Sequence, residues 1–204
     1  MKNLTIITLN SHGITDFAEA RNKELEKAKT PWVLFVDTDE IITKELEAEI
    51  EGAVRADQYN AYYIKRRDVF LGRELKHGET GKAHFIRLAR KGYGKWVRPV
   101  HEEWVGQGRV GTLSHPLIHH SHPSISSFLD KINLYSTLDA EYRYKSGVKS
   151  SLWKIAVYPI AKFKLNYLLR LGFMDGVPGL IIAMMMSFHS YLTWTKLYLL
   201  WHKK

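Results

Sequence analysis

Apolar and polar residues alternate in blocks along the first 60 positions, and the blocks predict alternating strands and helices. Residues 4–9 (LTIITL) and 32–36 (WVLFV) are short apolar runs, the pattern of strands that are covered on both faces. Between these runs, Asp16 followed by Glu19 predicts a helix N-terminus with a capping box. The apolar residues that follow at helical spacing are Phe17, Ala20, Leu25 and Ala28.

A second helix is predicted after the second apolar run, and short strands follow it. Thr43 is a suitable cap for this helix. Its expected buried side consists of Leu46, Ile50, Ala53 and Val54. The later strands are expected at residues 61–65, 84–89, 96–101 and 117–120. A mixture of helices and strands followed by a strand-rich half predicts an α/β fold with a mixed sheet.

Charge is distributed unevenly along the 204 residues and predicts two regions. Acidic residues are concentrated between Asp16 and Asp57, the last one is Asp175, and the final 29 residues carry only lysines as charged groups. We therefore expect a mixed polar domain over residues 1–145 and a helical, aromatic and basic region over residues 146–204. The small polar residues at the expected joint are Ser146, Gly147, Ser150 and Ser151.

The C-terminal region has the composition of a segment that contacts lipid. Aromatic residues alternate with lysine and arginine after residue 150, a mixture suited to lipid headgroups, although Pro159 is expected to interrupt a long helix. Residues 176–195 carry no charge and could just span a bilayer, with Pro178 placed for a helix start. Because His189 and Lys196 would share one face of that helix, we expect it to lie in the membrane plane.

The apolar run at residues 32–36 ends in three carboxylates within four residues, at Asp37, Asp39 and Glu40. Ligands of open α/β sheets bind beyond the carboxyl ends of the strands. Two aspartates separated by one residue can both reach a hard cation, which can neutralise a diphosphate. The alternative is a solvated turn before the helix at Thr43, whose N-terminus favours acid. Glu40 fits that alternative.

Net charge and cysteine content limit the classes of function. The chain has no cysteine, which excludes disulfides, thiolate metal sites and a cysteine nucleophile. Its net charge of +9 suits nucleic acid, anionic lipid or phosphorylated substrates. The basic residues form no compact stripe and no nucleic-acid-binding motif, so we expect no nucleic-acid partner. Arg87 is one of several arginines that could hold a phosphate.

Six stretches in a fixed order carry a resemblance to a known family: DFAEARNKELEKAKTPWVLFVDTDE, YYIKRRDVFLGRELKHG, FIRLARKG, VHEEW, LIHHSHPSISSFLDKINLYSTLDAE and GFMDGVPGL. With them the chain resembles the family 2 glycosyltransferases over residues 16 to 200. Within that family it is most similar to bacterial enzymes that add glucose or a similar sugar to the lipopolysaccharide inner core. The resemblance implies a GT-A (Rossmann-like) fold and a nucleotide-sugar donor, expected to be a UDP-sugar.

The resemblance also implies roles for individual residues. Asp37 and Asp39 match the D-x-D motif for a divalent metal, Mg²⁺ or Mn²⁺, and for the sugar nucleotide. His119 matches a histidine that serves such enzymes as a further metal ligand, and His120 and His122 are expected to be surface residues. The remaining matches are to donor-side and acceptor-side positions, namely Arg21 and Asn22 near the donor, and Val100, His101 and Glu102 of a V-H-E motif. Glu102 is our candidate for the base that takes the acceptor proton, with Glu103 as the rival, since adjacent strand residues face opposite ways.

The chain departs from the family at its N-terminus. Such enzymes have a further helix and strand between the first strand and the R-N helix, and here TIITLNSHG runs almost directly into TDFAEARN. We therefore expect a shortened GT-A domain that transfers sugar, with inversion, to a lipopolysaccharide-core or other cell-envelope glycan or glycolipid. The alternative is a catalytically degenerate, membrane-associated homologue that acts as a scaffold. The expected location is the cytoplasmic face of the inner membrane, with peripheral attachment to an anionic surface.

Overall fold

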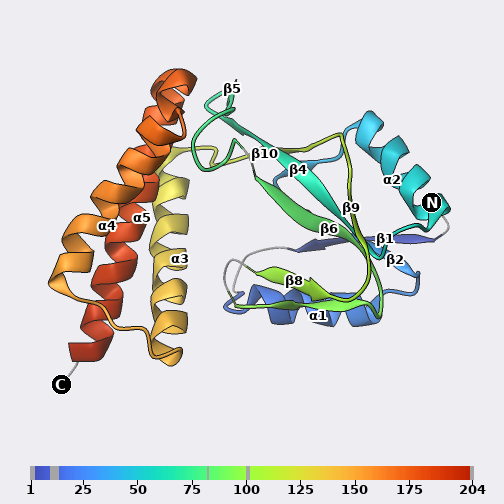
Figure 1. Cartoon of the computed structure of the whole chain (residues 1–204), viewed down its shortest axis with the longest axis horizontal. Helices are drawn as coiled ribbons and strands as arrows, with labels where there is room; N and C mark the ends of the chain where they lie inside the picture. Colours follow the sequence, from blue (N-terminus) through green and yellow to red (C-terminus); the bar gives the residue numbers. More distant parts are fainter. Residues whose placement is uncertain (1–2, 10–13, 82, 100–101, 203–204) are drawn as a thin grey trace. The chain divides into compact units, whose positions relative to one another are not determined.

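The computed structural model describes residues 3–9, 14–81, 83–99 and 102–202, and the chain packs into two compact units (Figure 1). The first comprises Met1–Arg67 and Ala83–His120, and the second Asp68–Lys82 and Ser121–Lys204. This division differs from the boundary expected after residue 145, because helix α3 (Ile125–Lys145) packs against α5 (Gly176–His202). The boundary drawn from composition remains a prediction.

The first unit is built on a mixed sheet whose strands run in the order β1-β2-β6-β4-β10-β3. These strands are β1 (Leu4–Leu9), β2 (Trp32–Asp37), β3 (Glu40–Ile41), β4 (Ala61–Phe70), β6 (His84–Arg90) and β10 (Leu117–His120). β1 is parallel to β2, whereas β6 is antiparallel to both β2 and β4. A further strand, β9 (Val110–Thr112), pairs with β4 in parallel. The expected mixed α/β class is confirmed.

β2 is apolar throughout because helices cover both faces of the sheet at this strand. Val33 and Phe35 pack against α1 (Phe17–Lys27), whereas Leu34 and Val36 pack against α2 (Lys44–Ala56). Successive side chains of a strand point to opposite faces, so both odd and even positions must be apolar. Asp37 continues the odd series and therefore points toward the α1 face.

Both predicted helix caps in the first unit are present. The Asp16 carboxylate accepts a hydrogen bond from the Glu19 backbone N at 2.8 Å, and Thr43 Oγ1 accepts one from Leu46 N at 3.2 Å. β1 ends at Leu9 and α1 begins at Phe17, so only residues 10–16 connect them. That connection is too short for an additional helix and strand, which agrees with the expected shortening.

The strand predicted at residues 96–101 is wrong. The structure has two short strands that form a separate antiparallel pair, β7 (Gly94–Val97) and β8 (Glu103–Gly106). Arg98 has φ +74°, a left-handed conformation that ends β7. Residues 100 and 101 lie outside the described part of the chain. The side chains of Trp96 and Trp104 meet in an edge-to-face contact and pack against Phe35.

The second unit is mainly helical. It contains α3, α4 (Leu152–Lys164), a π-helical turn η1 (Leu165–Leu169), a 3₁₀ turn η2 (Gly172–Asp175) and α5, and the end of β4 pairs there with β5 (Arg73–Glu74). α5 packs against both α3 and α4 (Figure 1). One hydrophobic cluster joins the β4–β5 hairpin to the helices and consists of Phe70, Leu75, Phe128, Ile132 and Ile182.

Two details of the second unit correct the sequence analysis. Pro159 does not interrupt α4, which continues through it to Lys164, and the Pro159 carbonyl accepts a hydrogen bond from Ser187 Oγ on α5 at 2.8 Å. His122 is half-buried and stacked on Phe128, with ring centroids 3.6 Å apart, rather than fully exposed as expected. By length and composition, the helical stretch Gly172–His202 could cross a membrane.

Candidate active site

The strand-end carboxylate Asp37 lies between two buried arginines. On α1, Arg21 donates from Nη2 to Asp37 Oδ1 at 2.6 Å, and on β6, Arg87 donates from Nη2 to Asp37 Oδ2 at 2.7 Å. The side chains of Arg21 and Arg87 are 3% and 6% exposed, whereas Asp37 is 31% exposed. Both oxygens of Asp37 are therefore committed to guanidinium groups, while one edge of the carboxylate still faces solvent.

Glu40 completes this buried charge cluster. Its Oε1 accepts from Arg87 Nη2 at 2.8 Å, its Oε2 accepts from the Asp37 backbone N at 2.9 Å, and its side chain is fully buried. The interpretation of Glu40 as a solvated acid near a helix N-terminus is wrong. A usable signal was its position three residues after Asp37, from which a glutamate can reach back to a backbone N–H, as in a capping box.

The two arginines fix the ionisation of Asp37. Burial on its own would raise the pKa of this carboxyl, but the charges of Arg87 and Arg21 outweigh it and hold the pKa below its ordinary value of 3.8. Burial would likewise lower the pKa of Arg87, yet Asp37 and Glu40 keep it above its ordinary value. Asp37 and Arg87 are therefore both charged at neutral pH.

Glu102 joins the same cluster and Glu103 does not. Arg21 Nε donates to Glu102 Oε1 at 2.9 Å, so one guanidinium holds both Glu102 and Asp37. The Glu103 side chain is 62% exposed and forms an ion pair with Arg98 at 2.5 Å. The two adjacent acids thus point in different directions, and only Glu102 faces the strand-end carboxylates.

The second aspartate of the D-x-D motif meets a histidine. His119 Nε2 lies 3.3 Å from Asp39 Oδ2, and the two side chains are 12% and 31% exposed. Strand pairing produces this approach, because His119 is the β10 partner of Glu40 on β3, and His120 N donates to the Asp39 carbonyl. His120 itself is exposed, as expected.

Of two further predicted residues, one has a structural role and the other lies outside the described part of the chain. Asn22 is a structural tether, since its side chain donates to the Trp96 carbonyl and accepts from the Trp96 N, both at 2.9 Å. These bonds hold β7 against α1 and use both ends of the amide. His101 lies outside the described residues, so its predicted role stays a prediction.

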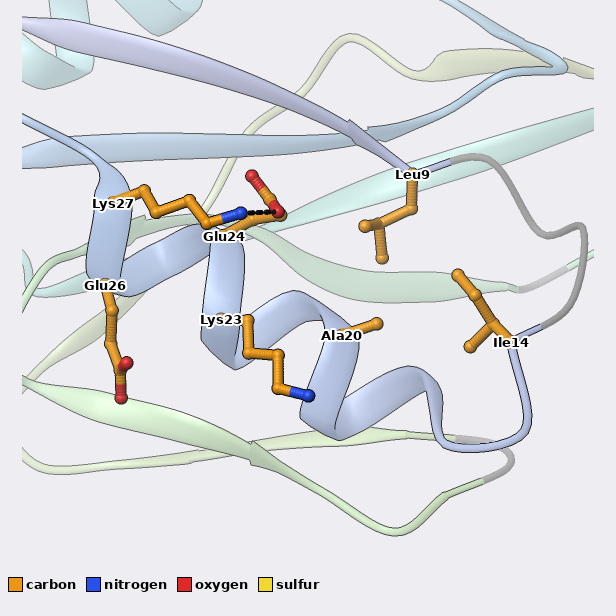
Figure 2. Close-up of a pocket in the computed structure, with 7 residues that line it drawn as sticks. All are labelled: Leu9, Ile14, Ala20, Lys23, Glu24, Glu26 and Lys27. Atoms are coloured by element: carbon orange, nitrogen blue, oxygen red, sulfur yellow. Dashed lines mark hydrogen bonds and ion pairs between the residues drawn. The ribbon is translucent and has the colours of Figure 1, made fainter.

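A hollow of about 500 Å³ lies between the end of β1 and α1 (Figure 2). Leu9, Ile14 and Ala20 contribute its apolar wall, and the charged residues of α1 that line it are Lys23, Glu24, Glu26 and Lys27. Leu9 is the sheet partner of Asp37, so the hollow begins one strand away from the acidic turn. Its volume falls within the range of small-ligand pockets.

The chain is similar to proteins that are named as glycosyltransferases, a class of enzymes. One relative is the lipopolysaccharide core biosynthesis glycosyltransferase LpsC of Rhizobium meliloti (strain 1021), 28% identical over 191 residues that cover 89% of this chain and 69% of that protein. Others are uncharacterized glycosyltransferases of Rickettsia typhi and Rickettsia conorii, each 28% identical over 179 residues and 81% of this chain. No family model matches the chain.

These relatives confirm the resemblance that the six sequence stretches indicated, at the level of glycosyltransferases related to lipopolysaccharide core enzymes. The chain spans 61% and 64% of the lengths of the two Rickettsia proteins. The identities of the donor, the acceptor and the metal are therefore treated as proposals.

Proposed function

We propose that the chain transfers a sugar from a nucleotide-sugar donor, a UDP-sugar, to a lipopolysaccharide-core or other cell-envelope glycan, by inversion in a shortened GT-A-type domain. The observation that carries the proposal is the convergence of Arg21, Asp37 and Glu102 with the Asp39–His119 pair at the carboxyl end of β2. The similarity to LpsC supports the choice of acceptor class.

In the proposed reaction, Glu102 acts on the acceptor, and Arg21, Asp37 and Arg87 hold Glu102 in place. Glu102 is the base that accepts the proton of the acceptor hydroxyl as its oxygen attacks the anomeric carbon. Arg21 holds Glu102 through Oε1, which leaves Oε2 for the acceptor proton. Asp37 and Arg87 fix the position of Arg21 from behind. Arg87 is buried and its Nη2 is held by Asp37 and Glu40, so we assign it a positioning role rather than the phosphate contact that the sequence suggested.

The donor set of the site fits a divalent metal, Mg²⁺ or Mn²⁺, best at Asp39 and His119. Both oxygens of Asp37 accept from arginines, and the two guanidinium charges disfavour a divalent cation at that carboxylate. Asp39 and His119 do fit, as a carboxylate and an imidazole nitrogen that already lie 3.3 Å apart. No group of three metal-binding side chains occurs within the residues that the structure describes. When bound, the metal would neutralise charge on the donor diphosphate.

Replacing His119 with Asn should weaken Mn²⁺-dependent UDP binding by more than about tenfold, because the imidazole ligand is lost. Calorimetry with UDP, with and without Mn²⁺, measures the effect. His120→Asn is the matched control, since its side chain is the exposed neighbour on the same strand, and it should bind like the parent. Equal metal-dependent binding by the His119 and His120 variants would remove His119 from the site.

A scaffold role is the second candidate, and the short connection between β1 and α1 favours it, because the family's donor-binding helix and strand have no room there. The two candidates differ in chemistry. A transferase should hydrolyse or transfer from a UDP-sugar when Mn²⁺ is added, whereas a scaffold should turn over no UDP-sugar under any metal condition.

We also propose peripheral attachment to the cytoplasmic face of the membrane through the helical region after about residue 150. The length and apolar composition of Gly172–His202 support contact with lipid. Alkaline carbonate should release the full-length chain from membranes into the soluble fraction, because a peripheral contact is reversible. Retention of the chain in the carbonate-washed pellet would instead favour a helix that spans the bilayer.

A further inference from the structure

One end of the second unit carries exposed apolar side chains from two segments that are far apart in the sequence. We call this surface the apolar cap, and it consists of Leu71, Leu169, Leu171, Phe173, Met174 and Val177, all exposed. Leu71 comes from the β4–β5 turn, Val177 from the first turn of α5, and the others from the connection between α4 and α5. Arg73 Nη2, next to Leu71, donates to the Met174 carbonyl at 3.4 Å, and Gly78 N donates to the Arg170 carbonyl at 2.9 Å. The two segments are therefore neighbours (Figure 1).

Two of these leucines occupy backbone positions that disfavour leucine. Leu71 has φ +49° and is followed by Gly72 at φ +74°, and Leu171 has φ +58°. At positive φ the Cβ atom crowds the backbone carbonyl, so Gly or Asn is the usual residue. Leucine is also unfavourable at an exposed position in water. Contact with an apolar phase would offset the cost of exposing leucine to water, which gives a physical reason for leucine at these positions.

The exposed basic residues around the apolar cap favour an anionic partner. Arg73, Lys76, Lys164 and Arg170 are exposed around it. Of the nearby acids, Asp68 and Asp175 are buried and Glu79 is paired with Lys162 at 2.8 Å, while Glu74 of β5 is half-buried, so basic residues outnumber accessible acids around the cap. Lys164 precedes Leu169 by five residues, about 7–8 Å along a helix. That spacing puts a cation at the headgroups when the cap lies about 5–10 Å deep, the depth of interfacial insertion.

We propose that the apolar cap inserts end-on into an anionic lipid surface, with Leu71 and Leu169 in the acyl boundary and the basic residues at the headgroups. This inference rests on the membrane attachment proposed above and narrows it to a surface that includes residues outside the C-terminal region. The helices then contact the membrane by one end of the bundle. An α5 that lay in the membrane plane or spanned the bilayer would instead contact lipid along its whole length.

The test is binding of the full chain to vesicles of phosphatidylcholine, with and without phosphatidylglycerol, measured by co-sedimentation. Leu169→Ser should lower the partition coefficient on mixed vesicles about tenfold, because burial of one leucine is lost. Leu71→Asn should have a similar effect while keeping the fold, since Asn tolerates positive φ. Lys164→Gln should lower binding about fivefold on mixed vesicles only, because one attraction to anionic lipid is removed.

Leu152→Ser is the matched control. Leu152 is 69% exposed and Leu169 is 76% exposed, and about 25 Å of helix separates them. End-on insertion predicts that Leu152→Ser binds within about twofold of the parent, whereas lengthwise contact predicts equal losses for both variants. Equal losses, or parent-like binding by both Leu169→Ser and Leu71→Asn, would overturn the cap and leave membrane attachment standing. A parent chain that binds neither vesicle would overturn both.

Discussion

Asp37→Ala should destabilise the protein by about 3–5 kcal/mol, because two hydrogen bonds between charged groups are lost, each worth about 1.5–3 kcal/mol. The variant removes the carboxylate that accepts from Arg21 and from Arg87, which are almost fully buried and then keep Glu102 and Glu40 as carboxylate partners. Chemical denaturation followed by circular dichroism measures the loss. Because fold and site depend on the same carboxylate, inactivity of this variant alone would say little about catalysis.

Asp39→Ala is the matched control for this prediction. Asp39 lies in the same turn, is 31% exposed, and its Oδ2 lies 3.3 Å from His119 Nε2. We expect its stability to stay within about 1 kcal/mol of the parent, the range for exposed ion pairs. If both variants lose the same stability, the buried arginines do not depend on Asp37.

The Asp37 effect should also depend on pH. Since the folded-state pKa of Asp37 lies below its ordinary value of 3.8, the carboxylate stabilises the fold fully above that value. As the pH falls through the lowered folded-state pKa, the contribution is lost. The difference in unfolding free energy between parent and Asp37→Ala should therefore be constant near neutral pH and shrink in acid below 3.8.

Glu102→Gln should lower the rate of sugar transfer by roughly a hundredfold to ten-thousandfold, the range for loss of a general base. Glutamine keeps an oxygen that can accept from Arg21 Nε, so the fold should be preserved. Affinity for the donor should barely change, because the proposed base contacts the acceptor. Steady-state transfer and UDP calorimetry on the same preparation separate the two quantities.

Glu103→Gln provides the control for the base. Its side chain is exposed and paired with Arg98 away from the Asp37 cluster, so transfer should continue at the parent rate. A Glu102→Gln chain that transfers like the parent, beside an inactive Glu103→Gln chain, would assign the base to Glu103. Retention of full activity by both variants would remove the V-H-E acids from the mechanism.

Sequence reasoning failed where a polar residue serves packing. α3 was not predicted, although it has 21 residues and a capping box at Ser124. Its buried face includes Ser136 and Asp139, which blur the apolar periodicity on which helix prediction relies. The structure satisfies both from other positions, since Lys196 donates to Ser136 Oγ at 2.8 Å and Arg143 donates to Asp139 at 3.0 Å.

The sequence by itself determined features that depend on neighbours in the chain. These include the two-faced apolar strand β2, the caps at Asp16 and Thr43, and the acidic turn that follows the strand. Each depends on local hydrogen bonding or on strand periodicity, and both are visible in consecutive residues.

Only the tertiary structure decided which acidic residues pair with arginine and which pairs with histidine. Arg21 and Arg87 reach Asp37 from elements 16 and 50 positions away, and Glu102 reaches Arg21 across 81. They leave Asp39 to pair with His119, so the two aspartates of one D-x-D motif have different partners. No local pattern encodes this division, because it arises from the sheet order that places β6 and the helix α1 beside the end of β2.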